Sequence, residues 1–330
     1  MITGGTGFLG KALALRLLEN GMDVTVFGRN EVIGQVLHNR GIRFVKGQLE
    51  DSDSVLSACY GSDYVIHCGA LSSPWGHPDD FHRANVLGTQ NIISGCLTHD
   101  VKRLVHVSTP SIYFDFTDRF LVKESDSLPC TFANHYARTK YEAELVVDDA
   151  VAKNGLNAIT IRPRGLFGVE DTSILPRLIR ANEKGKIPFV NGGTNIIDVT
   201  YIENVVDSLL LAMEAPSVYA GRKYNITNGE PMQMKELLAK VFLKMNMPMN
   251  AINIPYWLLA RIAHSMEWFA HTFQGDKEPL FTRYTVGVLS KSQTLDITAA
   301  RQDLGYSPKV SIEQGLDIFV EWWQKEGQYR

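Results

Sequence analysis

The chain has 330 residues, 45% of them hydrophobic and 21% charged, a composition typical of a soluble globular enzyme. Its formal net charge of −3, without a basic stripe, gives no electrostatic basis for binding nucleic acid. The cysteines have neither CxxC nor His/Cys ligand spacing, so we expect reduced thiols, no metal site and a cytoplasmic location; they are Cys59, Cys68, Cys96 and Cys130.

Strand-like and helical patterns alternate through the first half of the chain. Helices are predicted over 11–21, near 31–39, 52–59 and 79–97, and from about Asn134. Short apolar runs rich in Val and Ile lie between them, at MDVTVFG, RFVKG, YVIHC, RLVHVS and AITIRPRG. This alternation predicts βαβ units and a parallel sheet that is covered on both faces.

The pattern changes after residue 170. Helical runs dominate, at 174–184, 203–214, 233–245, 256–273 and 311–326. Short strand candidates lie at 196–202, 223–227 and 294–297. We therefore predict a dinucleotide-binding domain over 1–168, to which 196–228 returns. A smaller, mostly helical substrate-binding lobe is expected over 169–195 and 229–330.

The longest apolar stretch covers 254–273. It is interrupted by Arg261, His264, Glu267 and His271, which favours an amphipathic helix over a membrane span. We expect this helix to pack on the core, and peripheral contact with a membrane surface is the alternative.

A glycine-rich turn stands at the start of the chain. Gly4, Gly7 and Gly10 are followed directly by a helical pattern. Glycine permits positive φ and close approach of a pyrophosphate, and a helix N-terminus offers free N–H groups. We therefore expect a dinucleotide-binding turn, with a purely structural turn as the alternative. Because only three residues precede Gly4, we also expect the natural chain to begin a few residues upstream of Met1.

The end of the second predicted strand bears on the choice of cofactor. An acidic residue there would bind the ribose 2′-OH of NAD, whereas an Arg suits the 2′-phosphate of NADP. The sequence places Gly28 and then Arg29 at this point. This favours NADP, with NAD still possible and a simple surface Arg as the alternative.

Tyr136 and Lys140 are spaced i, i+4 on a predicted helix and so share one face. A nearby ammonium lowers the pKa of a tyrosine, which is ordinarily about 10, and lets it exchange a proton with a substrate oxygen. Tyr219 and Lys223 have the same spacing but surround a glycine before a strand. Thr109, at the end of a strand, is positioned to hydrogen-bond the same oxygen as Tyr136, or else to cap that strand.

Several segments, in order, resemble an extended short-chain dehydrogenase/reductase over essentially the whole chain. They are TGGTGFLG (3–10), NVLGT (85–89), VSTPSIY (107–113), YARTK (136–140), IRPRGLFG (161–168) and DVTYIENVVDSLLLA (198–212). The resemblance implies an α/β fold with a Rossmann-type doubly wound parallel sheet. It also implies a triad of Thr109, Tyr136 and Lys140, in which Tyr136 is the general acid in reduction and the base in oxidation. Family habit further suggests a homodimer.

The resemblance also extends the cofactor site. Beside the glycine turn, Arg29, Tyr136 and Lys140, it implies contacts from Phe8, Leu9, Gln48, Leu49, Cys68, Gly69, Ala70, Asn85 and Pro163. Asn85 would tie the catalytic strands together, and Pro163 would flank the nicotinamide. Two residues depart from the usual pattern: Gln48 replaces an Asp that meets adenine, and Gly69 replaces a common Ala.

Two positions argue against a sugar nucleotide as the substrate. That branch usually has Asn where this chain has Gly165, and an Arg diphosphate clamp where it has Ile197. The sequence is more similar to 3β-hydroxysteroid dehydrogenase/isomerase-type enzymes, which include sterol decarboxylating dehydrogenases and 2-alkyl-3-oxoalkanoate reductases. Aromatic residues of the second lobe are expected to fill its core or to line an apolar pocket: Tyr256, Trp257, Trp268, Phe269, Phe273 and Phe281.

The resulting expectation is an NADP(H)-dependent oxidoreductase for a bulky apolar molecule. It would interconvert a 3-hydroxy and a 3-oxo group on a steroid- or sterol-like substrate or a long-chain 2-alkyl-3-oxo acid. One alternative is a nucleotide-sugar epimerase or dehydratase with tightly bound NAD. The other is a non-catalytic NADP-sensing protein, although such sensors typically lose the Tyr or the Lys that this chain keeps.

Overall fold

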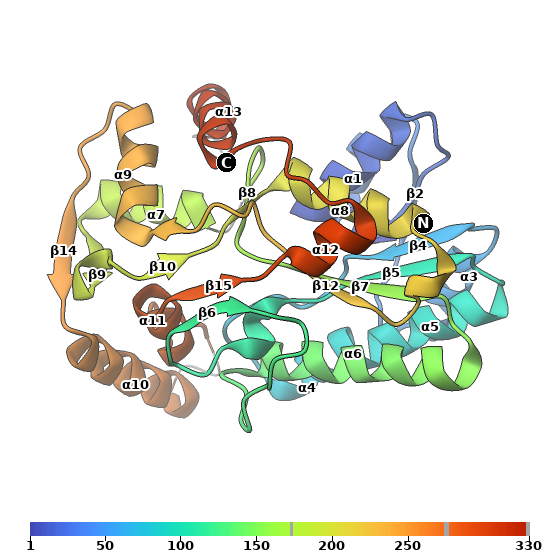
Figure 1. The fold of residues 1–330 in the computed structure, drawn as a ribbon, viewed down its shortest axis with the longest axis horizontal. Coiled ribbons are helices and arrows are strands. Elements are labelled where there is room, and N and C mark those ends of the chain that lie inside the picture. Colours follow the sequence, from blue (N-terminus) through green and yellow to red (C-terminus); the bar gives the residue numbers. More distant parts are fainter. Residues whose placement is uncertain (172–173, 274–276, 328–330) are drawn as a thin grey trace.

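A seven-stranded parallel sheet forms one half of the molecule (Figure 1). The computed structural model describes residues 1–171, 174–273 and 277–327. The strand order is β12-β7-β5-β4-β1-β2-β3, and every neighbouring pair is parallel. The strands are β1 (Ile2–Thr3), β2 (Thr25–Gly28), β3 (Arg43–Lys46), β4 (Tyr64–His67), β5 (Arg103–Val107), β7 (Ala158–Pro163) and β12 (Lys223–Ile226). The predicted doubly wound α/β sheet is confirmed.

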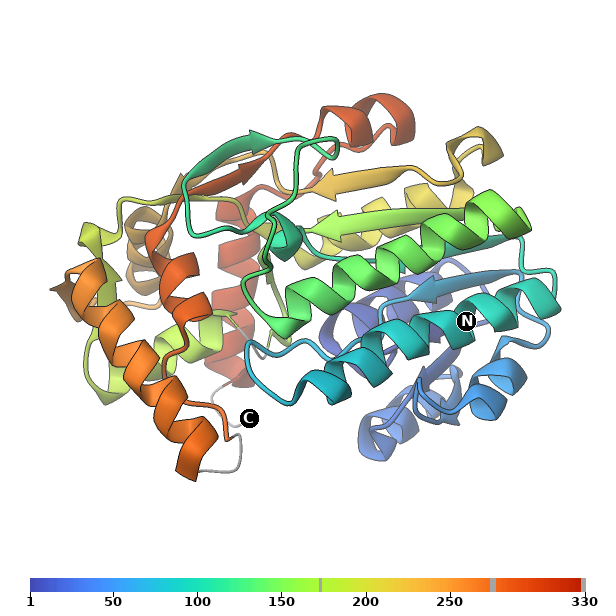
Figure 2. The ribbon, with the colours of Figure 1, turned by 90° about the horizontal axis from the view of Figure 1, so that it is seen from below.

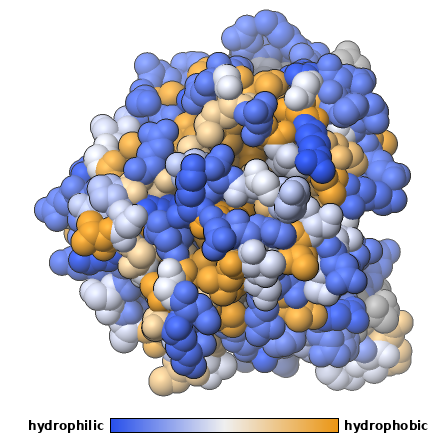
Figure 3. All heavy atoms as spheres, turned by 90° about the vertical axis from the view of Figure 1, so that its right-hand side faces the viewer, coloured by the Kyte–Doolittle hydropathy of each residue, from blue (hydrophilic) through white to orange (hydrophobic). Residues whose placement is uncertain are grey.

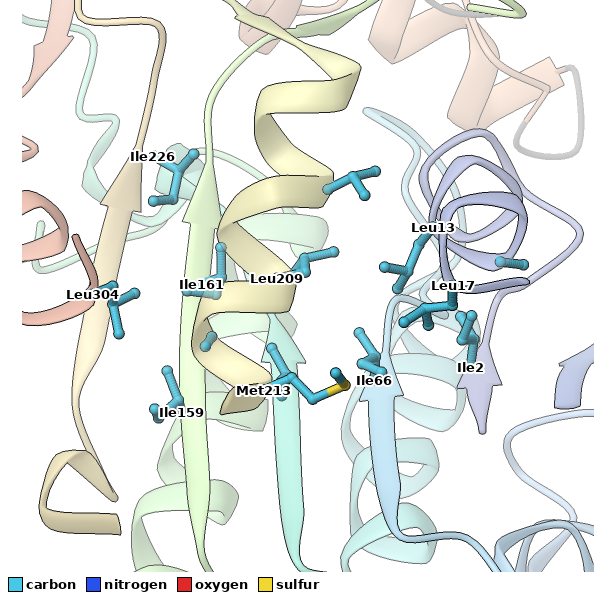
Figure 4. Packing of buried hydrophobic residues seen from close by; sticks show 14 of the residues in the cluster. Ile2, Leu13, Leu17, Ile66, Ile159, Ile161, Leu209, Met213, Ile226 and Leu304 are labelled. Carbon is cyan, nitrogen blue, oxygen red and sulfur yellow. The ribbon is translucent and has the colours of Figure 1, made fainter. Parts of the chain in front are cut away.

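Helices cover both faces of this sheet (Figure 2). One face is covered by α1 (Phe8–Glu19), α2 (Glu31–His38) and α8 (Ile202–Glu214), the other by α3 (Ser52–Cys59), α5 (Gly88–Thr98) and α6 (His135–Asn154). Figure 4 shows how Leu13 and Leu17 of α1 and Leu209 of α8 meet Ile2 and Ile66 of the sheet. Burying each such side chain stabilises the fold by about 1.5–3 kcal/mol. Figure 3 shows the end of the molecule that carries this sheet, where apolar residues are interspersed among hydrophilic ones.

The first strand is short but lies at the centre of the sheet. Ile2 is paired with Val26 of β2 on one side and with Ile66 of β4 on the other. Met1 continues the ladder, because its carbonyl accepts from Ile66 N (2.9 Å) and its amine donates to the Tyr64 carbonyl (2.7 Å). Burial lowers the pKa of that amine to about 6. The two residues of β1 thus join the two halves of the sheet.

The second half of the molecule combines helices with small sheets. A four-stranded sheet has the order β13-β10-β15-β6, and two further pairs are β11-β8 and β14-β9. These strands are β6 (Arg119–Val122), β8 (Leu166–Phe167), β9 (Ile187–Val190), β10 (Ile196–Ile197), β11 (Thr200–Tyr201), β13 (Met232–Gln233), β14 (Ala251–Ile254) and β15 (Gln293–Leu295). The helices are α7 (Ile174–Lys184), α9 (Met234–Lys244), α10 (Tyr256–Phe273), α11 (Arg283–Ser290), α12 (Thr298–Leu304) and α13 (Ile312–Lys325).

One predicted strand, 196–202, is wrong as a single element. Ile197 pairs with Met232 of β13 and Gln293 of β15, whereas Thr200 pairs with Leu166 of β8. The chain therefore leaves one sheet and enters another within three residues. In each sheet the backbone N–H and C=O groups of this segment find hydrogen-bond partners on neighbouring strands. From there, α8 and β12 rejoin the seven-stranded sheet.

The amphipathic stretch near 254–273 forms α10. No helix in the described part of the chain is long and apolar enough to span a bilayer. Within α10 the buried residues are Leu259, Ala263 and Ala270. The expectation that its aromatic residues fill the core is wrong for four of them, because Trp257, Trp268, Phe269 and Phe273 are exposed. Trp268 and Phe269 line an open cavity of about 730 Å³, as the alternative expectation of an apolar pocket would have it.

Candidate active site

The glycine turn forms a tight cradle at the carboxyl end of β1. Gly4 has a φ of +62°, and a Cβ there would lie 2.7 Å from the Cα of Gly69. A Cβ on Gly10 would lie 2.3 Å from the carbonyl oxygen of Gly4. Gly7 caps α1, whose first turn contains no acidic residue. The turn therefore presents free N–H groups and a positive helix end, which suits the pyrophosphate of a dinucleotide.

A cleft of about 610 Å³ lies beside this turn. The predicted cofactor residues that line it are Gly4, Gly7, Arg29, Leu49, Cys68, Gly69 and Ala70. Gln48 is exposed and does not line the cleft, and Phe8 and Leu9 pack against the core of the second lobe. Pro163 is buried at the end of β7. The cradle and the cleft together fit a dinucleotide.

Asn85 fastens the segment after β4 to helix α6. Its Oδ1 accepts from Leu71 N (2.7 Å), and its Nδ2 donates to the Leu71 carbonyl (3.2 Å) and to Thr139 Oγ1 (3.0 Å). Asn85 lies in a π-helical turn, His82–Leu87, which interrupts the helix predicted over 79–97. Such turns are frequent at functional sites. The predicted bracing role of Asn85 thus has a geometric basis, between the cleft wall and α6.

His67, which the sequence did not single out, extends this bracing together with Thr89 and Thr3, and all three residues are buried. His67 Nε2 donates to Thr89 Oγ1 (3.1 Å), which in turn donates to the Asn85 carbonyl (2.6 Å). On its other side, His67 Nδ1 accepts from Thr3 Oγ1 (2.6 Å), and that oxygen accepts from Gly69 N (3.1 Å). Burial lowers the pKa of His67 to about 3, so the ring is neutral and this order of donors holds at physiological pH. The only feature of the sequence that could have pointed to His67 is its place at the end of an apolar strand, in YVIHC.

Replacing Asn85 with alanine is expected to lower the free energy of unfolding by about 1–3 kcal/mol, because Leu71 N and the Leu71 carbonyl lose their partner. Cofactor affinity should fall as well, since the cleft wall would loosen. Thermal unfolding and cofactor titration measure the two effects. Asn39→Ala, which removes only an exposed contact with Gln35, is the matched control. Equal behaviour of the two variants would contradict the bracing role.

The Tyr136 hydroxyl meets two other hydroxyls at the carboxyl edge of the sheet. Burial raises the pKa of Tyr136 above its ordinary value, and hydrogen bonds with Thr109 and Ser72 act in the opposite direction. Thr109 follows β5, whereas Ser72 belongs to the loop after β4 and was not predicted. Thr109 and Tyr136 are thus together, as their positions in the sequence suggested. The arrangement brings three hydroxyl groups together at this edge of the sheet.

Two further hydroxyls, of Ser111 and Tyr284, extend this group; together with those of Tyr136, Thr109 and Ser72 they form what we call the hydroxyl cluster. Thr109 Oγ1 donates to Ser111 Oγ (3.0 Å), and Ser111 Oγ is 2.9 Å from the Tyr284 hydroxyl. Tyr284 belongs to α11 and acts electrostatically on Tyr136. Neither Ser111 nor Tyr284 could be identified from the sequence, because 173 residues separate them. The site therefore lies where the two halves of the molecule meet.

Lys140 is fully buried one turn after Tyr136, but its ammonium has a different partner. Nζ lies 3.1 Å from His106 Nε2, and His106 Nδ1 lies 3.4 Å from Thr160 Oγ1. Because an ammonium only donates, Nε2 accepts and Nδ1 carries the proton toward Thr160. Burial lowers the pKa of Lys140 to about 8 and holds that of His106 well below its ordinary value. The charges acting on the Tyr136 pKa do not include Lys140, so burial determines its direction.

Comparisons with known proteins identify the family of this chain. The NAD dependent epimerase/dehydratase family matches residues 1–227. The chain is 36% identical over 324 residues to a 2-alkyl-3-oxoalkanoate reductase of Stenotrophomonas maltophilia, covering 96% of both chains. It is 31% identical over 330 residues to a decarboxylating sterol-4-alpha-carboxylate 3-dehydrogenase of Mus musculus, covering 97% of this chain and 89% of the relative.

A solved structure shares the whole fold. UDP-glucuronic acid 4-epimerase from Bacillus cereus, in complex with NAD, matches with a TM-score of 0.78 and 19% identity, covering 98% of this chain and 96% of that one. A likeness at this identity shows the fold alone. The family match and the relatives go further: the chain belongs to the NAD-dependent epimerase/dehydratase family, as an extended short-chain dehydrogenase/reductase that uses NAD(P).

Proposed function

We propose that this protein is an NADP(H)-dependent oxidoreductase that interconverts a 3-hydroxy and a 3-oxo group on a bulky apolar substrate. The observation that carries the proposal is the meeting of the Tyr136, Thr109 and Ser72 hydroxyls at the carboxyl edge of the sheet. Alcohol–ketone redox chemistry needs such a proton donor and acceptor beside a hydride carrier. Two relatives named for reactions at a 3-hydroxy or 3-oxo carbon support the same reaction class.

In the mechanism, Tyr136 donates its hydroxyl proton to the substrate oxygen during reduction and takes it back during oxidation. Thr109 and Ser72 would orient that oxygen, since both hydroxyls lie close enough to the phenol to lower its pKa. The nicotinamide, when bound, supplies or accepts the hydride. The glycine turn would hold its pyrophosphate, and Lys140 would hold the adjoining ribose. His106 fixes the position of the Lys140 ammonium by accepting a hydrogen bond from it.

The preference for NADP rests on the cleft beside β2. Gly28 and Arg29 line it, and Gly28 leaves no carboxylate at the strand end to repel a phosphate. Asn30 is occupied as the cap of α2, because its side chain accepts from Ile33 N (3.1 Å). Arg29 is exposed and therefore available for the 2′-phosphate.

Arg29→Ala is expected to reduce the ratio of NADPH to NADH affinity by about ten-fold or more, because a charge-assisted hydrogen bond contributes about 1.5–3 kcal/mol. Titration of each cofactor by fluorescence measures the ratio. Arg40→Ala, at the far end of α2, is the control and should leave it unchanged. An unchanged ratio in Arg29→Ala would remove this residue from the phosphate site.

The structure also bears on the sugar-nucleotide alternative. Ile197 is buried in the core of the second lobe and supplies no cation for a diphosphate. The proposed function is tested by measuring NADPH oxidation with 3-oxo acids, 3-ketosteroids and UDP-sugars. Turnover of either of the first two classes is expected. Turnover of UDP-sugars alone, or of no compound, would overturn the proposal.

A further inference from the structure

Arg164 is a buried cation without a hydrogen-bond acceptor in the described part of the chain, unlike the buried Arg162 and Arg103. Its side chain is 8% exposed, yet its guanidinium makes no hydrogen bond or ion pair with any residue in the described part of the chain. Arg162, two residues earlier, donates from Nε to Glu144 (2.8 Å), and the equally buried Arg103 donates to the Ala212 carbonyl (3.1 Å). Burying an unpaired charge is costly, so a group of this kind indicates a site for an anion.

The position of Arg164 connects it to the hydroxyl cluster. It follows Pro163, the last residue of β7, at the same edge of the sheet as Thr109. The charged or polar groups that act on it are Tyr284 first and Asp198 second. Tyr284 also acts on Tyr136 and hydrogen-bonds Ser111. Arg164 and Tyr136 therefore both lie within electrostatic range of the Tyr284 phenol, on two different elements.

Asp198 does not neutralise Arg164. Its Oδ2 accepts from Leu295 N (2.7 Å), and it is not within ion-pair distance of the guanidinium. Asp198 therefore acts on Arg164 only through space and leaves its N–H groups without an acceptor. The guanidinium fork is thus left for a ligand, and its geometry matches a carboxylate in a bidentate manner.

We propose that Arg164 binds the carboxylate of a 3-hydroxy or 3-oxo acid substrate. In such an acid a single carbon separates the carboxylate from the reacting carbon, so one small site can hold both. This inference rests on the proposed function and narrows its substrate class, since a neutral ketone would leave Arg164 unpaired. A diphosphate is the less fitting anion, because this chain has the buried, uncharged Ile197 at the position of the Arg clamp that sugar-nucleotide enzymes usually carry.

The test compares a long-chain 2-alkyl-3-hydroxy acid with its methyl ester, with NADP⁺ as oxidant. In each turnover the hydride on C3 passes to the nicotinamide and the hydroxyl proton passes to Tyr136. We expect the wild-type protein to prefer the acid at least ten-fold in kcat/KM. Arg164→Met should remove that preference, because it lowers kcat/KM for the acid far more than for the ester. Arg222→Met, an exposed arginine before β12, is the matched control and should keep the preference.

Calorimetric titration provides a readout that does not depend on turnover. The wild-type protein with cofactor should bind the acid more tightly than the ester, and Arg164→Lys should show an intermediate difference because it keeps the charge but loses the fork. Equal binding of acid and ester by the wild type would overturn the role of Arg164 even if the variants fail to fold. So would UDP-glucose binding that depends on Arg164. Turnover of neither acid nor ester would overturn the role of Arg164, and the proposed function itself would fall only if 3-ketosteroids were not turned over either.

Discussion

Tyr136→Phe is expected to lower kcat by about 100- to 10,000-fold, because it removes the only group in the hydroxyl cluster that is argued to exchange a proton with the substrate. Folding should be unaffected, since the ring remains and only one hydroxyl is lost. Tyr141→Phe, the next tyrosine along α6, is the matched control. It packs against Phe132 and away from the site, and should retain full activity. Steady-state kinetics with both variants, together with thermal unfolding, test the assignment.

The pH dependence of the reaction should follow from the raised pKa of Tyr136. Burial favours the protonated phenol, so reduction, which needs the proton, is expected to be constant through neutral pH. Oxidation needs the phenolate, so its kcat should rise as pH increases above neutrality. The two profiles are measured separately with NADPH and NADP⁺. An oxidation rate that is independent of pH and equally retained by Tyr136→Phe would exclude this tyrosine as the base.

Glu144→Ala is expected to have the largest effect on stability, lowering the free energy of unfolding by about 3–5 kcal/mol. The Glu144 side chain is fully buried, and its two oxygens accept from Nε and Nη2 of Arg162. Arg162 also donates to the Tyr113 hydroxyl, so the pair ties α6 to β7 and to the segment after β5. Removing the carboxylate leaves a buried guanidinium without its counter-ion. Chemical denaturation measures the loss.

Two controls separate this effect from a general loss of charge on α6. Asp149→Ala removes an exposed pair with Lys153 on the same helix and should change stability by no more than about 1 kcal/mol. Combining Glu144→Leu with Arg162→Met removes both charges and should recover much of the stability lost in Glu144→Ala. A double variant as unstable as the single one would show that packing, rather than the unpaired charge, dominates.

Much of the fold follows from patterns that are local in the sequence. The period of apolar residues, with Gly and turn residues between the runs, predicts the parallel sheet because strands alternate with helices of sufficient length. The prediction of one strand over 196–202 is wrong because the hydrogen-bond partners of this segment lie in two different sheets. No local sequence pattern encodes that change of partner. The prediction that Trp257 and Trp268 are buried is wrong for a related reason. Their apolar character predicts burial, but only the packing of neighbouring helices decides which face is covered.

The site divides in the same way. Gly4, Gly10 and the spacing of Tyr136 and Lys140 could be identified from the sequence by itself, because a tight turn and a helix face are local features. His106, Ser72 and Tyr284 could not, since each reaches the site from a different element. The partner of Lys140 and the isolation of Arg164 were likewise decided by tertiary structure. Pairing and burial of a charge depend on what the rest of the chain brings beside it.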